Sequence, residues 1–462
     1  MRNKNINMTS GPLMRNMIAY TVPIILSGIL QLLYSAADLV VVGQFAGSDA
    51  FAAVGATSSL NNLFITLFLA ISNGGCICVA QYYGARDGKN VHETVHTCVA
   101  VSIISGLFVT VISLLFVDEA LALMGTHKDI IDMSAKYLRI VLGAAPFTLF
   151  YNFAAGILRA TGDTKRPFYI LIFTGLVNVI LNIILVVGFG MDVDGVAIAT
   201  FVGAALNALI AGRILIKSGD SIRVNLKQLK IYPDKLKKVL NYGVPSGIQS
   251  LLFSGSNVII QSAVNSFNSV AVIAGNAAAS SIEGFIYTSM NSVSNAALNF
   301  AGQNYGARKY KRVTQSMICA CIFTTVVGFA MGFSTNMFGD SLLSIYEPTN
   351  AAARSFGLVR FSIVAKLYFI CGIYEILMST LRGIGSSWAP TVIAIASVGG
   401  VRIMWVLFVF PHFHTLPMLY ISWPLTWITS IVLLLIVYLT RSKKLFEKNE
   451  EQYRNESEKL TE

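Results

Sequence analysis

The chain has 462 residues, of which 55% are hydrophobic and 12% are charged. Soluble domains carry about 25% charged residues, and no soluble fold has an interior large enough to hide so much apolar surface. The composition therefore excludes an ordinary soluble protein and predicts one that lies in a lipid bilayer. The formal net charge of +11 is typical of cytoplasmic loops rich in Lys and Arg. Because no basic stretch carries the interleaved aromatic residues that stack on bases, we expect no nucleic-acid partner.

Twelve long apolar segments predict an all-α integral membrane protein with 12 transmembrane helices. About 20 apolar residues cross the roughly 30 Å hydrocarbon core at 1.5 Å per residue. The first segment contains Pro23 and Asp38 and is followed by no small-residue cleavage site, so we expect an uncleaved first span rather than a signal peptide. The predicted spans are 17–42, 53–80, 94–117, 131–156, 167–188, 194–216, 240–265, 271–302, 313–335, 353–379, 388–410 and 417–440.

Charged residues divide between the two sides of the predicted spans. Loops after odd-numbered spans are acidic, with Asp118 and Asp194 as examples and Lys128 as the one clear basic residue. Loops after even-numbered spans are basic, and because positively charged loops stay in the cytoplasm, both termini are predicted to be cytoplasmic. The basic residues of these loops are Arg86, Lys89, Arg159, Lys165, Arg166, Lys217, Arg223, Lys227, Lys230, Lys235, Lys237, Lys238, Arg308, Lys309, Lys311, Arg312, Arg382, Arg441, Lys443 and Lys444.

Six cysteines lie within or beside apolar segments and form no CxxC pair. In such surroundings cysteine behaves as a small apolar residue, so the sequence predicts neither a disulfide framework nor a thiolate metal site. The six are Cys76, Cys78, Cys98, Cys319, Cys321 and Cys371.

The sequence contains an internal repeat with a nearly constant offset. AQYYGARDGKN at 80–90 returns as GQNYGARKYKR at 302–312, so that Gln303 takes the place of Gln81 in the second copy. Pro23 and Pro245 are related by the same offset, and LRATGDTKRP at 158 returns as LRGIGSSWAP at 381. A repeat of six spans keeps one orientation, which predicts two pseudo-symmetric six-helix lobes in a parallel repeat. The predicted parts are an N-lobe at 1–216, a cytoplasmic linker at 217–239, a C-lobe at 240–440 and a charged cytoplasmic tail at 441–462.

These landmarks resemble those of the multidrug and toxic compound extrusion (MATE) transporters over about residues 10–440. The resemblance implies efflux of lipophilic or cationic compounds, driven by inward movement of protons or sodium ions, through lobes that open alternately to either side. It also implies a multi-pass protein of the bacterial plasma (inner) membrane. We expect small substrates and the lipid bilayer as partners, a monomer, and no cofactor. The matching features are GA followed by charges after spans two and eight, LRATGD after span four, Pro23, Asp38, Gly43, Asn178, Asn182, Gly188 and Gly195 through Thr200.

Asp38 stands alone in the apolar stretch LLYSAADLVVVG, well inside the first span. A carboxylate there costs about 2.5–3.5 kcal/mol on insertion scales, so such residues usually face a cavity or a partner and serve a function. The alternative is a carboxyl that only joins helices through hydrogen bonds. The repeat places Ile260 at the equivalent C-lobe position, so only the N-lobe carries this group.

Asn178 and Asn182 are four residues apart and therefore share a face of the fifth span. With Thr200 on the sixth span they can hydrogen-bond a carboxylate or coordinate a cation, and the family resemblance places them beside Asp38. Many family members carry a second Asp near position 182, where this chain has Asn. We predict a cation-coupling site that takes a proton, with sodium as the alternative, formed by Asp38, Asn178, Asn182 and Thr200. Amides that merely join helices are the other interpretation.

The predicted C-lobe spans contain further charged residues, Glu283 and Glu375, with Arg360, Lys366 and Arg402 in the same region. The two carboxylates could attract a cationic substrate or form a second proton site, or they could pair internally, for example Glu375 with Arg402. Some sodium-coupled family members carry a Glu in the seventh span near position 253, where this chain has Phe253. The lack of that Glu weighs against a sodium site here. The predicted substrate-cavity candidates are Tyr34, Phe64, Phe153, Phe253, Glu283, Tyr287, Met290 and Glu375.

The stretch His92-Glu93-Thr94-Val95-His96 matches the HExxH pattern, in which two histidines bind zinc and the Glu is a general base. The best third ligand, Asp194, is predicted to lie on the other side of about 30 Å of bilayer, and the repeat copy at 314–318 reads TQSMI. We therefore expect no metal site and no enzyme, with a membrane zinc metalloprotease as a remote alternative.

A nearer alternative is a lipid-linked precursor flippase of the same superfamily, although those proteins generally have more basic central cavities and extra spans.

Overall fold

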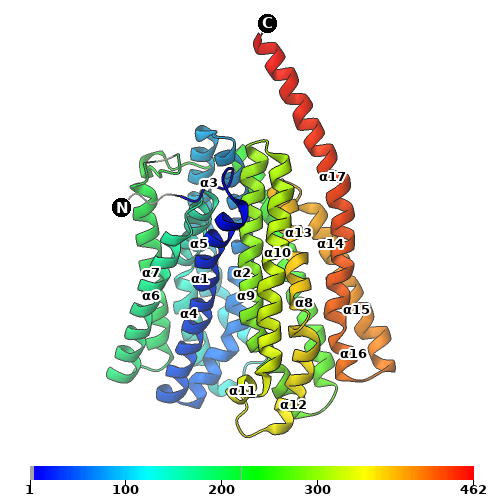
Figure 1. Cartoon of the computed structure of the whole chain (residues 1–462). Helices are drawn as coiled ribbons and strands as arrows, with labels where there is room; N and C mark the ends of the chain where they lie inside the picture. The colour runs from blue at the N-terminus through cyan, green and yellow to red at the C-terminus, as the bar shows by residue number, and fades with distance from the viewer. Residues whose placement is uncertain (1–4, 220, 462) are drawn as a thin grey trace. The chain divides into compact units, whose positions relative to one another are not determined.

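The computed structural model describes residues 5–219 and 221–461, and within them all regular secondary structure is helical, without strands (Figure 1). Each predicted span is helical over most of its length. The first half contains α1 (Leu13–Val41), η1 (Val42–Ala46), α2 (Ser48–Gly84), α3 (Gly88–Leu123), α4 (Lys128–Gly143), α5 (Ala145–Ala160), α6 (Lys165–Asn182), η2 (Ile183–Gly188), α7 (Val193–Ile216) and η3 (Leu226–Gln228). The second half contains α8 (Pro233–Asn265), α9 (Val270–Gly306), α10 (Tyr310–Met337), α11 (Gly339–Ser344), α12 (Ala351–Arg360), η4 (Phe361–Ala365), α13 (Tyr368–Gly383), α14 (Trp388–Ala394), η5 (Ile395–Val401), α15 (Arg402–Met404), η6 (Trp405–Val409), η7 (Phe410–His412), α16 (Leu416–Tyr420) and α17 (Ser422–Thr461).

Nine helices in the described part of the chain are long and apolar enough to cross a membrane, or up to 11 if each of two bent pairs forms one span. Their large apolar side chains are widely exposed, as at Leu115 (62%), Val326 (62%) and Leu439 (67%). Such exposure is stable only against lipid, so the protein is an all-helical, multi-pass membrane protein. α8 lies outside this set because Ser, Asn and Gln interrupt its apolar residues, and the total of 12 spans stays a prediction.

The two halves share backbone landmarks at the offset of the sequence repeat. Both ends of α9 follow the corresponding ends of α2 at the offset that separates Gln303 from Gln81. Arg86 and Arg308, related by the same offset, both have positive φ, at 57° and 58°. The bent pairs correspond too: α4 and α5 meet at 44°, and the stretch Ala351–Ala365 meets α13 at 42°. A positive φ is uncommon outside glycine, so its recurrence supports a parallel structural repeat.

The chain folds into two compact units whose boundaries fall inside α1 and α8. The first unit contains the chain up to Ile6 and Val22–Gly247, and the second contains Asn7–Thr21 and the chain from Ile248 onward. The boundary in α1 lies next to Pro23, and that in α8 lies close to Pro245. Proline removes one backbone hydrogen bond of its helix. In both helices the boundary between the units therefore lies close to the residue where that hydrogen bond is missing.

The N-terminal part of α8 belongs to the first unit, and the N-terminal part of α1 belongs to the second. Both parts pack tightly against other helices of their unit. In the first unit, a Cβ added at Gly74 of α2 would lie 2.2 Å from the carbonyl oxygen of Val239 in α8, so glycine is required for this crossing. In the second unit, the rings of Tyr20 in α1 and Phe300 in α9 meet edge to face with centroids 5.7 Å apart. Nearby, the Asn304 side chain donates to the carbonyl of Met8 at 3.1 Å. The second unit ends in α17, which runs to Thr461 and so includes the predicted tail up to that residue; Glu462 lies outside the described residues (Figure 1, red).

Candidate functional site

Asp38, near the end of α1, accepts a hydrogen bond from Asn182, the last residue of α6, with 2.5 Å between Asp38 Oδ1 and Asn182 Nδ2. The same Nδ2 lies 3.4 Å from Oδ1 of Asn178, one turn earlier. Both asparagines are buried, and Asp38 is partly buried. Three of the four residues of the predicted coupling site thus form a continuous polar chain in the first unit. We call Asp38, Asn178 and Asn182 the Asp38 cluster.

Two of the predicted coupling residues have a buried oxygen without a hydrogen-bond partner in the described structure: Asn182, at Oδ1, and Thr200 on α7, at Oγ1. Leaving a buried acceptor unpaired costs about 1–3 kcal/mol. No hydrogen bond among the described residues joins Thr200 to Asp38. The unpaired oxygen of Asn182 is therefore available to an added donor or a cation at the cluster, and oxygens of this kind are the ligands that hard cations prefer.

Both helices that carry the cluster widen into π-helical turns directly beyond it. η1 follows α1 from Val42 to Ala46, and η2 follows Asn182 from Ile183 to Gly188. The two π-helical turns also contact each other. Such turns are rare and often occur at functional sites, because they displace side chains from regular helical positions. Here they hold the ends of α1 and α6 together and so set the separation of Asp38 and Asn182.

Tyr34, predicted to line the substrate cavity, packs on α6 one turn before Asp38. A Cβ added at Gly175 would lie 1.9 Å from Cε2 of the Tyr34 ring, so no other residue fits this position without displacing the tyrosine. The Tyr34 hydroxyl lies 3.5 Å from the carbonyl oxygen of Ile172. Because Gly175 lies one turn before Asn178 on the same helix, this contact supports the geometry of the Asp38 cluster.

Three residues near the cluster were not identified from the sequence. Thr174, one turn before Asn178, donates to Asn207 Oδ1 at 2.7 Å and joins α6 to α7. Tyr137 of α4 lies close enough to Asp38 for the two side chains to interact electrostatically. Thr174 extends the four-residue spacing of the asparagines, a signal that could have found it. Nothing in the sequence distinguishes Tyr137 from other aromatic residues of its span.

In the second unit, Glu283 of α9 and Arg360 of α12 form a buried ion pair. Arg360 Nη2 lies 2.7 Å from Glu283 Oε2, and Arg360 Nε lies 3.1 Å from both carboxylate oxygens. Arg360 Nη1 donates to Asn276 Oδ1 at 2.7 Å, and Tyr420 donates to the same oxygen at 3.2 Å. The exposed fractions are 3% for Glu283 and 6% for Arg360. Of the roles left open for Glu283, internal pairing is the one this structure contains.

Arg402 is fully buried at the start of α15. It donates to Ser256 Oγ at 3.3 Å and to Thr426 Oγ1 at 3.2 Å, and its guanidinium carbon lies 5.1 Å from the centre of the Trp423 ring. The predicted pairing of Arg402 with Glu375 is wrong. The Arg402 guanidinium contacts two hydroxyl groups and an aromatic ring, and no carboxylate of the described residues bonds to it.

The carboxylate of Glu375 makes no hydrogen bond or ion pair with any residue in the described ranges. Its own backbone carbonyl accepts from Ser294 Oγ at 3.1 Å. Arg382, two turns later on α13, donates to Gln249 Oε1 instead. Glu375 is thus a partly buried carboxylate that no cation of the described chain neutralises through direct contact.

A cavity of about 260 Å³ lies beside the Glu283–Arg360 pair, entirely within the second unit. The Phe253 and Tyr287 rings form part of its wall and stack with centroids 6.5 Å apart. Ile260, the counterpart of Asp38, also lines it, so this wall is apolar where the first unit has a carboxyl. The lining residues are Phe253, Asn257, Ile260, Gln261, Asn276, Ser280, Glu283, Gly284, Tyr287, Arg360, Tyr368 and Trp423.

Three other cavity candidates pack inside their units. Phe64 packs against a buried apolar cluster that includes Val109 and Leu138. Phe153 is 2% exposed, and Met290 is fully buried with its sulfur accepting a hydrogen bond from Thr324 Oγ1 at 3.0 Å. In this structure Phe153 and Met290 fill space between helices, because neighbouring side chains cover their apolar surfaces, and Phe64 is partly buried.

The HExxH residues hold the segment between α7 and α8 against the start of α3. His96 is fully buried and uses both ring nitrogens: Nδ1 lies 2.8 Å from the His92 carbonyl oxygen, and Nε2 accepts from the backbone N–H of Asn225 at 3.1 Å. Glu93 pairs with Lys235 at 3.3 Å. No group of three His, Cys, Asp or Glu residues within the described ranges is placed to hold a metal. The nitrogen that zinc would need on His96 is already occupied by the backbone of this segment.

Comparison with known proteins assigns the family. The MatE family model matches the chain twice, over residues 23–184 and 245–407, and together the matches cover more than half of the chain. The two matches begin at Pro23 and Pro245, the pair of prolines that the internal repeat relates to each other. The chain belongs to the MatE family. Members of this family are membrane transporters rather than enzymes, in agreement with the MATE resemblance of the sequence motifs.

Similar proteins occur in Bacillus subtilis (strain 168) and in Staphylococcus aureus. The probable multidrug resistance protein YoeA is 29% identical over 433 residues, which cover 91% of this chain and 92% of YoeA. The probable multidrug resistance protein YpnP is 24% identical over 83% of this chain and 85% of its own length. The multidrug export protein MepA of Staphylococcus aureus (strain NCTC 8325 / PS 47) is 22% identical over 54% of this chain and 55% of MepA.

Solved structures share the fold. An outward-facing multidrug resistance MATE family transporter of the MOP superfamily superposes with a TM-score of 0.88, at 20% identity, over 97% of this chain and 100% of that one. Crystal structures of MATE in bent and straight conformations each give a TM-score of 0.87 at 20% identity over 97% of this chain and 99% and 100% of theirs. The MatE fold therefore extends over nearly the whole chain.

Proposed function

We propose that this MatE protein is a secondary active multidrug exporter of the bacterial plasma membrane that exchanges lipophilic or cationic compounds for protons by alternating access. Family membership supports transport, and the names of YoeA, YpnP and MepA, which describe multidrug resistance or export, support the substrate class. The observation that carries the proposal is the Asp38 cluster, in which a lone carboxyl in an apolar helix meets a buried amide with an unpaired oxygen.

The chemistry of the cluster suits a group that gains and loses a proton. An ionised Asp38 can only accept hydrogen bonds, and Asn182 Nδ2 supplies one at 2.5 Å. A protonated Asp38 becomes a donor, and the unpaired Oδ1 of Asn182 can accept from it once the amide rotates. The two protonation states then require two orientations of one amide between α1 and α6. Protonation is coupled to transport if the two conformations of the protein differ in proton affinity, and reversing a 1:99 population takes about 5.5 kcal/mol.

Sodium is the less suitable coupling ion for this arrangement. A hard cation requires several converging oxygen ligands, and this cluster directs an N–H of Asn182 at the one carboxylate. A bound sodium ion would have to displace that hydrogen bond, whereas a proton needs only a rotation of the amide. Phe253 stands near the position of the span-seven Glu of some sodium-coupled relatives, and its ring stacks on Tyr287.

Substrate contacts are proposed for the aromatic cavity of the second unit. Aromatic faces attract organic cations, and Phe253 and Tyr287 provide two of them. A volume of about 260 Å³ is smaller than the roughly 300–1,000 Å³ of drug-sized pockets, so this cavity accommodates part of a substrate. A lipid-linked precursor flippase is less well supported, because Arg360, the cation that lines this cavity, is neutralised by Glu283.

The proposal is tested by measuring efflux of an organic cation in everted membrane vesicles with proton and sodium gradients imposed separately. The proton gradient should drive uptake into wild-type vesicles, and Asp38→Asn should abolish that dependence. Glu119→Gln, which removes an exposed carboxyl outside the cluster, is the matched control. Normal proton-driven transport by a folded Asp38→Asn protein would refute the coupling site. Uptake driven only by a sodium gradient would show that sodium, and not the proton, is the coupling ion.

A further inference from the structure

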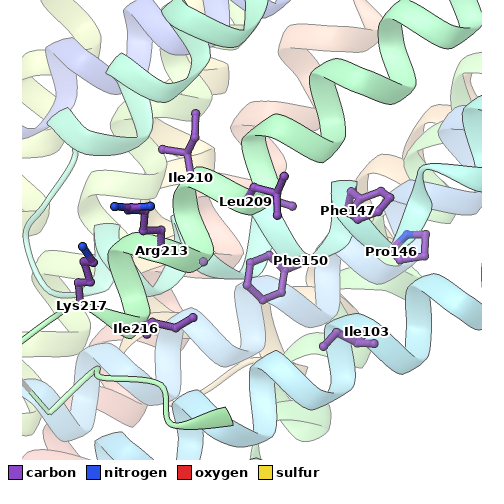
Figure 2. A pocket seen from close by; sticks show the side chains of 11 residues that line it. Ile103, Pro146, Phe147, Phe150, Leu209, Ile210, Arg213, Ile216 and Lys217 are labelled. Carbon is purple, nitrogen blue, oxygen red and sulfur yellow. The ribbon is translucent and has the colours of Figure 1, made fainter.

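An open pocket of about 790 Å³ lies on the first unit between α3, α5 and α7 (Figure 2). Its walls are apolar, formed by Ile103 of α3, Phe150 of α5 and Leu209 of α7 among others. Of the 11 lining residues, Arg213 and Lys217 alone carry polar side-chain groups. None of the 11 belongs to the Asp38 cluster or to the cavity of the second unit.

Small residues on α7 create the space for this pocket. Ala208 and Gly212 are four residues apart and therefore face the same way, and a Cβ at Gly212 would lie 3.3 Å from Cε1 of Phe150. On the opposite wall, α3 and α5 cross closely, because a Cβ at Gly106 would lie 2.3 Å from Cα of Pro146. The pocket is thus built into the packing of three helices, and larger side chains on α7 would close it.

The two cations lie together at one end of the pocket. Arg213 is in the last turn of α7, and Lys217 follows one turn later. Both are exposed, and neither forms an ion pair with any residue of the described chain. Figure 2 shows their nitrogen atoms on one side of the pocket and Pro146 and Phe147 on the other. Since α7 is long and apolar enough to cross a membrane and ends at Ile216, we expect the two cations at the depth of the lipid headgroups, where Lys and Arg at helix ends extend to the interface.

We propose that this pocket binds an anionic phospholipid, with an acyl chain along Phe150 and Leu209 and the phosphate between Arg213 and Lys217. An apolar wall beside two exposed cations matches a molecule that has a hydrocarbon chain and a net negative headgroup. A zwitterionic headgroup would bring its own cation toward the same two residues and is disfavoured. The bound lipid would rest on α7, the helix that carries Thr200 and Asn207, and the proposal therefore goes beyond efflux to a lipid that stabilises the first unit.

The test is native mass spectrometry of the purified full-length protein titrated with dioleoyl phosphatidylglycerol or dioleoyl phosphatidylcholine. Wild type should bind phosphatidylglycerol more tightly. Arg213→Gln/Lys217→Gln should weaken that binding by roughly fivefold for each cation removed and leave phosphatidylcholine unchanged. Leu209→Trp, which adds volume at an exposed wall residue, should weaken both lipids. Lys227→Gln/Lys311→Gln removes the same charge from exposed lysines outside the pocket and should change neither.

The proposal is overturned if the control double variant loses phosphatidylglycerol to the same extent, since the effect would then come from net charge. It is also overturned if glycerophosphoglycerol, which has no acyl chains, competes as well as the lipid, because an anion site alone would explain the data. If the Gln variant fails to fold, Arg213→Lys/Lys217→Arg keeps both charges and should retain the preference for phosphatidylglycerol, and loss of that preference in the folded protein counts against the site.

Discussion

The carboxylate of Glu283 accepts three hydrogen bonds from the guanidinium of Arg360, a residue 77 positions later in the chain. The guanidinium also lies 5.1 Å from the centre of the Trp423 ring and donates to Asn276. Burying two charges is costly, and the cost is offset only when both partners are paired and their remaining donors are satisfied. This pair meets both conditions. Its contribution to the stability of the second unit therefore depends on the presence of both residues.

Glu283→Gln should destabilise the protein by about 3–5 kcal/mol, because it leaves Arg360 buried with its charge uncompensated. The thermal unfolding of purified protein in detergent is the measurement. The double variant Glu283→Gln/Arg360→Met should recover part of the loss, since no unpaired charge then remains. If Glu283→Gln unfolds at the same temperature as wild type, solvent reaches Glu283 and Arg360, and the two residues do not form a buried ion pair in the folded protein.

Gly175→Ala should destabilise the first unit by about 1–3 kcal/mol through overpacking, because the new methyl group would lie 1.9 Å from the Tyr34 ring. Proton-driven efflux should fall with it, since Tyr34 and Gly175 support the Asp38 cluster. Gly255→Ala is the control, because a Cβ there meets nothing within 4 Å. The double variant Tyr34→Ala/Gly175→Ala should fold better than Gly175→Ala alone, and equal stability of the two would exclude this collision as the cause.

His96→Ala should expose the segment between α7 and α8 to proteolysis, because the backbone N–H of Asn225 loses its acceptor. The bond is partly buried, and loss of such a hydrogen bond costs about 0.5–1.5 kcal/mol. Limited proteolysis of solubilised protein, followed by mass spectrometry of the fragments, would locate the cut. His412→Ala removes an exposed histidine and should leave the pattern unchanged. Zinc chelators should not reproduce the effect, and a chelator-induced cut at this segment would favour a metal at His96 instead.

Asp163, in the turn between α5 and α6, should make stability depend on pH. Burial raises the pKa of its carboxyl, against the opposing effect of the Arg166 backbone and side chain. A raised pKa means that the folded protein binds this proton more tightly than the unfolded chain, whose Asp has a pKa of about 3.9. The stabilising contribution is therefore complete below about pH 3.9 and is lost as the pH rises through the folded-state pKa.

Asp163→Asn tests this sign. As the pH rises from about 4 to neutrality, wild type should lose thermal stability relative to the variant, because only wild type has the buried carboxyl that must ionise. Melting curves of both proteins across this range give the difference. A difference that is constant with pH, or that changes in the opposite direction, would show that Arg166 outweighs burial at this position.

Much of the architecture follows from the sequence because it depends on local and repeated features. The apolar segments are long enough to span a bilayer whatever they pack against, and the family model starts twice, at the two prolines that the repeat relates. The spacing of Asn178 and Asn182 places both on one helical face before any neighbour is known. Their meeting with Asp38 was expected from the family resemblance, and the structure joins Asp38 to Asn182 at 2.5 Å.

Only the tertiary structure decided which helical faces meet. Helical periodicity states which residues share a face but not which face of another helix lies opposite, and residues far apart in the chain carry no spacing signal. For that reason Glu283 could be paired with Arg360, and Arg402 with hydroxyl groups, only from the structure. The same holds for His96, whose sequence pattern suggested zinc and whose ring nitrogen instead receives the backbone of Asn225. Composition and repeat determined the membrane architecture, and long-range packing determined the partner of each buried charge.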